Sequence, residues 1–486
     1  MEDFVLISYF VSLFILFVFG SHGFIMIYYY NKYKHVKNSP KNETMPEGKV
    51  TIQLPFYNEQ YVVERLLEAV TKLDFPKDQF EIQVLDDSTD ETVAITAALV
   101  QKYQAEGFDI EHIRRPSREG FKAGALKYGT KFCKGDYIAI FDADFVPQPD
   151  FLKKTLPFFN EEKVGMVQTR WEHLNGDYSI LTKVQALALD GHFVIEQNVR
   201  NKAGFFINFN GTGGVWRKSC IEDAGNWHAD TLTEDLDLSY RAQLNGWRFV
   251  FLRDSVSPAE LPMEINALKT QQFRWTKGAI ETSKKILPLV WKSNIPFRIK
   301  LHSTFHLTNN LVFPFILLAA ILNLPLMFIK NSGSHEVYFM ALSMFILAFV
   351  GSFLFYMYAQ KDIRTDWRKK IALFPLFMAG SMGFAVNNSR AVIEGLLDRK
   401  SEFVRTPKFK VVDQKDDWKN KKYTTSKLDF SVIVETLLAI YCFVSILSSI
   451  YFMEFAALPF QILFFTGFAF VSYTSIRTAF AKKNVA

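Results

Sequence analysis

Residues 136–145, DYIAIFDADF, form an apolar run of strand length that ends in two acidic residues, Asp142 and Asp144. Longer helical patterns precede and separate such runs, and helices are expected in 59–73 and 120–134. Short apolar strands that alternate with helices are typical of a parallel α/β sheet. The sequence therefore predicts one α/β domain whose other strands are VTIQLPFYN (50–58), FEIQVLDDST (80–89) and VGMVQTRW (164–171).

The composition combines features of membrane and soluble proteins. Of 486 residues, 49% are hydrophobic and 22% are charged, which fits apolar segments joined to a soluble domain in two structural units. The three cysteines, Cys133, Cys220 and Cys442, lack metal-type spacing, so we expect no disulfide framework or zinc site and a cytosolic soluble part. Basic loops near an anionic leaflet account for the net charge of +6, and no nucleic-acid partner is expected.

The first apolar segment, residues 4–30, carries no acidic or basic charge and is long enough to cross a hydrocarbon core of roughly 30 Å. Acidic residues precede it and lysines follow it, which is the reverse of a cleaved signal peptide. The N-terminus is therefore expected outside and residue 31 onward inside. Four further spans are predicted at about 304–329, 337–358, 431–452 and 456–478.

Residues 371–396 begin apolar but carry Asn387, Asn388, Arg390 and Glu394 in their second half. Basic segments flank them, RTDWRKK before and RKSEFVRTPKFK after. If these residues crossed the membrane, one basic segment would lie outside, against the positive-inside rule. We therefore predict an interfacial or re-entrant segment. Five spans then leave the α/β domain, both basic segments and the AKKNVA tail inside.

Acidic pairs end two of the predicted strands: Asp86 and Asp87 in LDDS, and Asp142 and Asp144 in FDADF. In an open parallel sheet, ligands bind beyond the carboxyl ends of the strands. Carboxylates without cationic neighbours in sequence repel one another, and a hard divalent cation relieves that repulsion. The pattern indicates Mg²⁺ or Mn²⁺, although each pair alone also fits a solvated turn.

Three other stretches each admit two interpretations. Lys122, between two glycines at a predicted helix start, suits either a phosphate or a solvated cap. FNGTGGVWR (209–217) contains three glycines, which either let the backbone approach a ligand closely or form a tight bend. In LTEDLDLSYR, Asp235 precedes a helical run and fits a helix N-cap as well as a site residue.

The stretch KTQQFRWTKG (269–278) places an amide, an arginine and a tryptophan on one side of a predicted helix. Gln271, Arg274 and Trp275 stand at i, i+3 and i+4 and so share a face. Hydrogen-bond donors beside a flat ring suit a polar, planar ligand. The alternative is an amphipathic helix whose tryptophan lies at the membrane interface and whose arginine snorkels.

Taken in order, these stretches resemble the inverting family 2 glycosyltransferases with a GT-A fold, an α/β Rossmann-like fold, and especially their membrane-embedded polysaccharide synthases. The resemblance covers roughly residues 50–285 and extends weakly to 408. Its final portion looks most like the cellulose-synthase-like mannan and glucan synthases of plants and their bacterial relatives. The matching elements are LPFYNE, LDDS, KAGAL, DAD, FNGTGGVWR, TED and QQFRW.

The resemblance implies a role for each candidate. Asp87 would contact the base or ribose of a nucleotide, and Asp142 and Asp144 would hold the metal and diphosphate. Asp235 would be the general base. Further substrate contacts are expected at Lys122, Gly211, Thr212 and Glu234.

In the synthases that this chain resembles, the QQFRW face lies at the entrance to a membrane channel. The resemblance therefore implies that Gln271 and Trp275 meet the acceptor, with Trp275 stacked on its terminal sugar. Arg274 would reach the diphosphate. The resemblance also implies that the acceptor hydroxyl attacks opposite the departing nucleoside diphosphate, so that an α-linked donor yields a β-glycoside.

The same family has a cytosolic gating loop of the form F-x-V-T-x-K. In FVRTPKF (403–409), Phe403, Thr406 and Lys408 match, whereas Arg405 stands where valine is usual. The predicted organisation is a transmembrane helix (1–31), a cytosolic GT-A domain with interface helices (32–300) and a transmembrane region (301–486). This last region contains an interface segment (371–396) and a gating-type loop (397–430).

The implied protein is a multi-pass membrane enzyme with a cytosolic catalytic domain. It would polymerise a hexose from a UDP- or GDP-hexose donor into a β-linked glucan or mannan and pass the growing polysaccharide through its own channel across the lipid bilayer. One alternative is transfer of a single sugar to a membrane lipid. Another is a transporter or receptor with an inactive α/β domain, which lacks support because no predicted span contains paired intramembrane charges.

Overall fold

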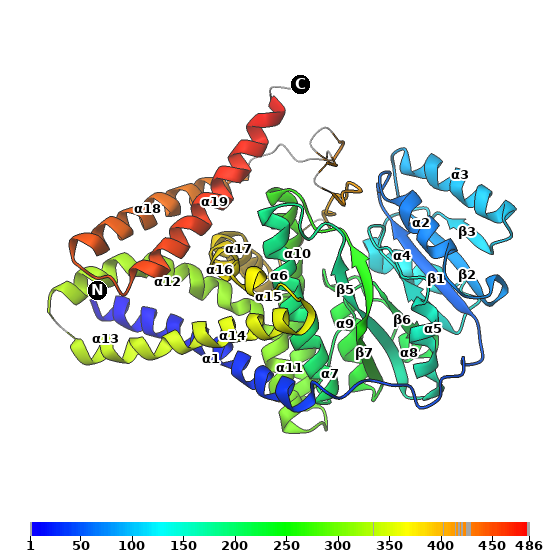
Figure 1. The fold of residues 1–486 in the computed structure, drawn as a ribbon, viewed down its shortest axis with the longest axis horizontal. Coiled ribbons are helices and arrows are strands. Elements are labelled where there is room, and N and C mark those ends of the chain that lie inside the picture. The colour runs from blue at the N-terminus through cyan, green and yellow to red at the C-terminus, as the bar shows by residue number, and fades with distance from the viewer. Residues whose placement is uncertain are drawn as a thin grey trace.

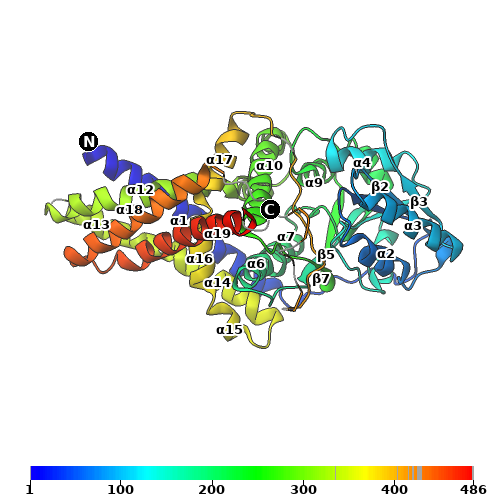
Figure 2. The same ribbon diagram turned by 90° about the horizontal axis from the view of Figure 1, so that it is seen from above.

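The computed structural model describes residues 2–333, 335–401, 403–413, 415–416, 418, 421–423 and 429–483. It consists of an α/β domain and a bundle of long apolar helices, which lie at opposite ends of the molecule (Figure 1). Helix α10 (Ile265–Lys292) lies between these two parts in both views (Figure 2).

The α/β domain is built on one seven-stranded sheet with the order β3-β2-β1-β4-β6-β5-β7. Its strands are β1 (Val50–Phe56), β2 (Phe80–Asp86), β3 (Ile110–Ile113), β4 (Tyr137–Ile140), β5 (Val164–His173), β6 (Gly214–Arg217) and β7 (Arg248–Ala259). The four predicted strands are confirmed as β1, β2, β4 and β5. These four strands run parallel to one another, as expected, whereas β6, which was not predicted, runs antiparallel to both β4 and β5.

Helices cover both faces of the sheet because its central strands are apolar on both sides. Every residue of β2 and β4 is buried. One face packs against α2 (Val63–Thr71), α3 (Thr92–Ala105) and α5 (Phe151–Thr155). The other face packs against α4 (Phe121–Thr130), α8 (Lys218–Asp223) and α9 (Glu234–Leu244). The predicted helices 59–73 and 120–134 are thus confirmed as α2 and α4, each shorter than expected.

A helical layer connects the sheet to the apolar bundle. It contains α6 (Ile180–Asp190), a π-helical turn (Gly191–Gln197), α7 (Asn198–Lys202) and α10. The bundle itself contains α1 (Glu2–Tyr33), α11 (Phe297–Thr308), α12 (Val312–Asn331), α13 (Glu336–Leu342), α14 (Ile346–Ile363), α15 (Trp367–Ile371), α16 (Phe374–Gly383), α17 (Ala385–Leu396), α18 (Ser431–Tyr451) and α19 (Leu458–Lys483).

Five helical segments of the described chain are long and apolar enough to cross a membrane. They are Glu2–Tyr33, Phe297–Asn331, Glu336–Ile363, Ser431–Tyr451 and Leu458–Phe480, and they coincide with the five predicted spans. The orientation of these helices relative to the two sides of a membrane stays a prediction.

The predicted interface segment 371–396 is a bent helix pair. Its two arms, Trp367–Gly383 and Ala385–Leu396, meet at an angle of 47°. The first arm packs on α19, where the backbones of Gly383 and Gly467 approach so closely that a side chain on either would clash. The second arm packs on α10. The bend thus connects the apolar bundle to the helix that carries QQFRW, whether or not the pair crosses the membrane.

Candidate active site

A cleft of about 180 Å³ lies at the carboxyl ends of β1, β2 and β4 and reaches the QQFRW face of α10. Residues that are far apart in the sequence converge here because parallel strands end at the same edge of the sheet. All but one of the predicted site residues line it: Asp87, Lys122, Asp142, Asp144, Gly211, Glu234, Asp235, Gln271, Arg274 and Trp275.

The exception is Thr212, whose side chain is completely buried behind the cleft. Its hydroxyl accepts a hydrogen bond of 2.9 Å from the backbone N–H of Asp142. Thr212 therefore fixes the turn that follows β4 and presents Asp142 to the cleft. A direct contact between Thr212 and substrate stays a prediction.

The first carboxylate after β4 is paired with a lysine. Lys122, in the first turn of α4, places its Nζ 2.5 Å from Oδ1 of Asp142 and donates to the carbonyl of Gly211 at 2.9 Å. Burial disfavours the ammonium, but the carboxylates of Asp142 and Glu234 outweigh this and raise the pKa of Lys122. Lys122 is therefore a fixed positive charge in the cleft rather than a solvated cap.

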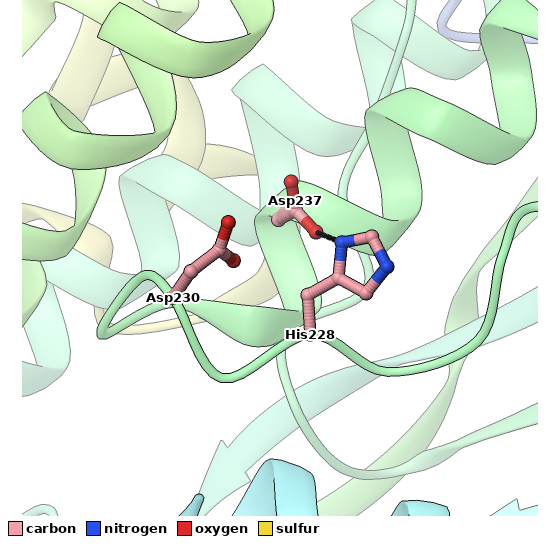
Figure 3. Close-up of side chains that lie close together, drawn as sticks. All are labelled: His228, Asp230 and Asp237. Atoms are coloured by element: carbon pink, nitrogen blue, oxygen red, sulfur yellow. Dashed lines mark ion pairs between the residues drawn. The ribbon is translucent and has the colours of Figure 1, made fainter.

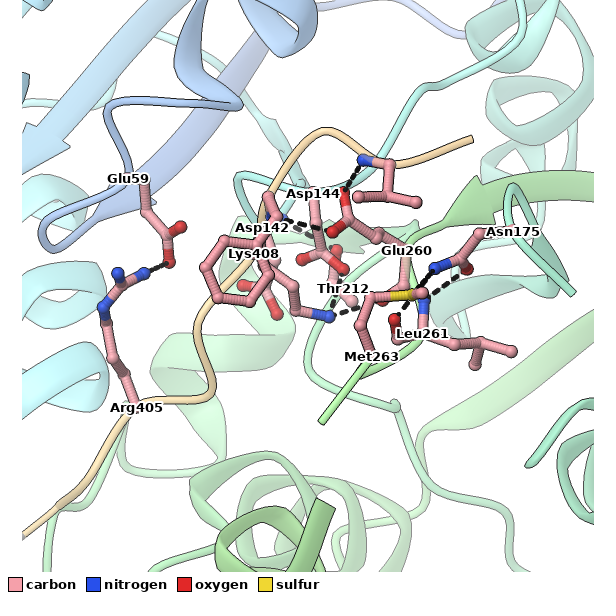
Figure 4. A network of polar contacts seen from close by, with 12 residues as sticks. Glu59, Asp142, Asp144, Asn175, Thr212, Glu260, Leu261, Met263, Arg405 and Lys408 are labelled. Atoms are coloured by element: carbon pink, nitrogen blue, oxygen red, sulfur yellow. Dashed lines mark hydrogen bonds and ion pairs between the residues drawn. The ribbon is translucent and has the colours of Figure 1, made fainter. Parts of the chain in front are cut away.

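The second carboxylate is paired with another lysine from a distant part of the chain. Nζ of Lys408 lies 2.7 Å from Oδ2 of Asp144 and 2.5 Å from the carbonyl oxygen of Glu260 (Figure 4). Each of the two aspartates thus already neutralises a cation. The two carboxylates offer only oxygen ligands, and their cleft attracts positive charge. Both properties fit a hard divalent cation such as Mg²⁺ or Mn²⁺.

The third acidic residue of the cleft, Asp87, is held rigidly by Arg115. The guanidinium binds the carboxylate at two points, Nε to Oδ1 at 2.8 Å and the terminal nitrogen to Oδ2 at 2.6 Å. Both side chains are only 8% exposed. A bidentate pair of this kind fixes the orientation of Asp87 as well as its charge.

Next to Asp87, an arginine stacks on a tyrosine. The guanidinium of Arg118 lies 3.3 Å from the ring centroid of Tyr57, and both residues line the cleft. Among the described residues no carboxylate lies within ion-pair distance of Arg118. This part of the cleft therefore offers the flat ring of Tyr57 and the hydrogen-bond donors of Arg118 to a planar ligand.

Asp235 lies in the first turn of α9, which begins one residue earlier. The N-cap is Thr233, so the alternative that Asp235 caps this helix is wrong. Its Oδ1 accepts a hydrogen bond of 2.8 Å from the backbone N–H of Leu236. Burial, followed by the charge of Glu234, raises the pKa of Asp235 to about 7. A carboxylate with this pKa suits proton abstraction near neutral pH.

The QQFRW residues lie on a continuous helix, as predicted. Buried lysines hold this helix on either side of them: Lys269 pairs with Glu435 of α18 at 2.7 Å, and Lys277 pairs with Glu394 of α17 at 3.3 Å. Between them, the Arg274 guanidinium lies 4.7 Å from the Phe403 ring. The Nε of Arg274 is buried without a hydrogen-bond partner, so this donor is available to a ligand.

The segment around FVRTPKF lies across the cleft, although part of the predicted loop 397–430 falls outside the described residues. Arg405 pairs with Glu59 at 2.6 Å, and the carboxylate of Glu260 accepts the backbone N–H groups of Phe409 and Val411 (Figure 4). Neither Glu59 nor Glu260 was predicted as a site residue. Glu59 belongs to the matching element LPFYNE, which was the available signal, whereas Glu260 follows a strand without any local signature.

A second cluster of possible metal ligands consists of His228, Asp230 and Asp237, whose ligand atoms lie within 4.8 Å of one another (Figure 3). Lys285 already lies among them, with Nζ 3.1 Å from His228 Nδ1 and 2.9 Å from Asp237. Arg241 also pairs with Asp237, at 2.6 Å. None of the three possible ligands lines the cleft described above, and we assign no metal to this cluster.

Comparison with known proteins adds to this geometry. Residues 46–278 match the family model described as "Glycosyltransferase like family 2". The chain thus contains a family 2 glycosyltransferase domain. Within the family, it is 44% identical over 244 residues to a probable glucomannan 4-beta-mannosyltransferase 7 of Oryza sativa subsp. japonica, and 41% identical over 253 residues to a probable glucomannan 4-beta-mannosyltransferase 10 of Arabidopsis thaliana.

These matches cover 49% and 51% of this chain but only 41% and 45% of the two relatives. The chain therefore aligns with less than half of the length of each. A solved mannosyltransferase from Pyrobaculum calidifontis, in complex with GDP-Man and Mn²⁺, aligns over 82% of this chain and all of its own, with a TM-score of 0.56 and 17% identity. This similarity concerns the fold, and it confirms the predicted GT-A fold.

Proposed function

We propose that this family 2 glycosyltransferase is a membrane-bound inverting hexosyltransferase that builds a β-linked glucan or mannan from a nucleotide sugar. One observation carries the proposal. A single cleft contains the aspartates after β4, the carboxylate of Asp235 and the QQFRW face of α10. The residues proposed to bind the donor and those proposed to bind the acceptor therefore line one cleft beside the apolar helices.

Asp235 is the proposed general base. Its raised pKa lets it take the proton of the acceptor hydroxyl near neutral pH, while the backbone hydrogen bond to Oδ1 fixes its carboxylate. The hydroxyl oxygen then forms a bond to the anomeric carbon as the bond from that carbon to the diphosphate breaks. The proton ends on Asp235, and the electron pair of the broken bond leaves with the diphosphate.

Positive charges in the cleft stabilise the leaving diphosphate. Asp142 and Asp144 would hold a divalent cation, which when bound neutralises charge that develops on the phosphate oxygens. Lys122 contributes an ammonium whose pKa the neighbouring carboxylates raise, so it stays charged. Arg274 contributes a guanidinium with an unused donor. Preorganised charges of this kind often lower the barrier of an enzymatic reaction more than any other single effect does.

The donor nucleotide is proposed to be a guanosine diphosphate. Guanine presents two adjacent acceptors, N7 and O6, which suit the two-point hydrogen bonds of an arginine, whereas an N–H donor separates the two carbonyl acceptors of uracil. Arg118 has this chemistry, and Tyr57 offers a ring for stacking. The mannosyltransferase names of the relatives agree with a mannosyl donor. Arg118→Ala should therefore reduce the preference for GDP over UDP in competition binding by about 5-fold or more.

Two cavities among the apolar helices support passage of a polymer. A cavity of about 160 Å³ adjoins Gln272 and Asn388, and the buried Nδ2 atom of Asn388 has no hydrogen-bond partner. Ser381 is shared with a larger cavity of about 760 Å³, which extends from Asn309 to Lys330. The cavity therefore extends along about the whole length of α12, which is roughly 30 Å from the rise per residue of an α-helix.

The second candidate function is transfer of one sugar to a membrane lipid. The walls of the larger cavity are mainly apolar, with aromatic rings such as Phe17, Phe345 and Phe460, and such walls also suit a lipid chain. This observation favours a lipid acceptor as much as a glycan.

Product analysis separates the two functions. The purified protein in lipid nanodiscs is incubated with Mn²⁺ and a panel of radiolabelled GDP- and UDP-hexoses. The proposal expects an insoluble or high-molecular-weight product from the donor alone, degraded by a β-mannanase or a β-glucanase. A product that extracts into organic solvent and requires added lipid favours the second function, and no transfer from any donor contradicts both.

A further inference from the structure

One face of α10 continues beyond Trp275 and packs on the turn that precedes Asp235. Its members recur every three or four positions, which places them on one side of the helix: Gly278, Glu281, Thr282 and Lys285. Glu281 accepts the backbone N–H of Leu232 at 2.9 Å, and the hydroxyl oxygens of Thr282 and Thr233 lie 3.1 Å apart. The turn before the proposed base is thus bonded to the helix that carries the proposed acceptor surface.

Gly278 allows this close contact. A Cβ on Gly278 would lie 2.7 Å from the Cγ2 atom of Thr233 and 2.9 Å from the carbonyl carbon of Leu232. Any other residue at this position would therefore push the turn away from α10. The absence of a side chain sets the spacing between the two segments.

A buried ion pair joins α9 and α10 two turns beyond Gly278. The Nζ atom of Lys285 lies 2.9 Å from Oδ1 of Asp237, whose side chain is completely buried. Arg241, one turn along α9, pairs with Oδ2 of the same carboxylate at 2.6 Å. The geometry of such a pair is strict, because a displaced charge loses its partner without gaining water.

Apolar packing alone does not fix the register of the two helices. A buried cluster between them contains Leu236 and Tyr240 from α9 and Ala279 and Ile286 from α10. Apolar contact is non-directional, so it holds the helices together but permits small shifts along their axes. The ion pair and the Gly278 contact lie at different points along α10 and oppose such shifts.

We propose that Asp237 and Lys285 are positioning residues that lock the helix of the base to the helix of the acceptor surface. Neither lines the cleft, so both act through the separation of Asp235 and Trp275. The inference rests on the proposed function, because it takes these two residues as base and acceptor surface. The acceptor hydroxyl must meet the base in one geometry, and an error of about 1 Å can reduce the rate about 100-fold.

Lys285→Met tests the lock through the fate of the transferred sugar. With a radiolabelled nucleotide sugar, incorporation into product and release of free hexose are measured in one reaction of the purified full chain. Because α9 also packs on the sheet, Asp235 should stay beside the donor. Hydrolysis by water and the KM for the donor should therefore stay within about twofold of the wild type, whereas transfer should fall about tenfold or more.

Two further variants control this result. Lys285→Arg restores a cation and should recover most of the transfer. In Lys284→Met, the adjacent lysine of α10 is removed, and its partners lie at the end of α17: Asp398 at 2.6 Å and the carbonyl oxygen of Leu396 at 2.9 Å. Lys284→Met should leave the ratio of transfer to hydrolysis unchanged. Equal losses of both reactions in Lys285→Met, or no loss of transfer, overturn the inference.

Gly278→Ala tests the lock without removal of a charge. Alanine favours a helix more than glycine does, so a role in helix stability alone predicts a protein that is at least as stable and active. The lock predicts that the methyl group displaces the turn and lowers the ratio of transfer to hydrolysis, as in Lys285→Met. The control is Gly380→Ala in α16, where the added Cβ meets only Val184, at 3.9 Å.

An unchanged ratio in Gly278→Ala overturns the inference, even if Lys285→Met yields no folded protein. If the wild type transfers sugar in that case, the inference fails and the proposed function stands. If the wild type transfers no sugar from any nucleotide donor, the proposed function fails, and the inference fails with it.

Discussion

The backbone of Gly211 passes so close to Asp235 that a Cβ on Gly211 would lie 3.0 Å from the Oδ2 atom of that carboxylate. Gly211 also has a φ of +80°, which only glycine adopts readily. Of the two interpretations of FNGTGGVWR, close approach to a functional group thus describes this glycine better than a bend alone. The oxygen that would be crowded is the one left free by the hydrogen bond from Leu236.

Gly211→Ala should therefore lower the transfer rate by about tenfold or more, because the new methyl group displaces the carboxylate of Asp235. A tenfold loss corresponds to an increase of about 1.4 kcal/mol in the activation free energy. The control is Gly204→Ala, since Gly204 has a similar φ of +73° but nothing within 4 Å of its added Cβ. Initial transfer rates of folded, purified variants provide the comparison. Equal losses in the two variants would mean that backbone strain, rather than contact with Asp235, explains the effect.

The pH dependence of kcat/KM should show an acidic limb. Asp235 acts as a base only when deprotonated, so kcat/KM should rise about tenfold per pH unit below about pH 7 and level off above it. Glu234→Gln removes a negative charge that raises the pKa of Asp235, and the limb should move to lower pH. A limb that stays in place in Glu234→Gln would show that another group titrates.

Trp275→Ala should impair transfer to the acceptor much more than hydrolysis of the donor by water, because water needs no stacking surface. Arg274→Ala should impair both reactions, since both release the same diphosphate. The two rates are measured on purified protein of verified fold. If Trp275→Ala reduces both rates equally, Trp275 only anchors α10 at the membrane interface.

Removal of divalent cations should stop the reaction. Asp142 and Asp144 are expected to bind the diphosphate through a metal, so EDTA should abolish transfer and added Mn²⁺ or Mg²⁺ should restore it. Binding of the nucleoside diphosphate, measured by calorimetry, should weaken in parallel. Full activity after exhaustive chelation would remove the metal from the proposed mechanism.

Local pattern was sufficient to predict the parts of the site that lie at element ends. The aspartates after β4 follow a buried apolar run, and Gln271, Arg274 and Trp275 share a helical face. Periodicity alone therefore identifies these residues as candidates for the site. The same holds for the five apolar helices, whose length and composition are local properties.

Contacts between distant segments were beyond that reasoning. Lys408 and Asp144 are 264 positions apart, and no local pattern indicates that they pair. The antiparallel β6 has only four residues, too few to reveal its direction or partners. Asp235 fitted an N-cap by composition, but the helix begins one residue earlier, because Thr233 occupies the cap position.

Asp235→Asn provides the most direct test of the proposed mechanism, because the change removes the proposed base and preserves size and a hydrogen-bonding oxygen. Transfer from the preferred nucleotide sugar and the dissociation constant of that donor are measured on the same purified protein. We predict a rate about 10²- to 10⁴-fold lower with nearly unchanged donor affinity. A variant that retains more than about a tenth of the wild-type rate would contradict the assignment of Asp235 as general base.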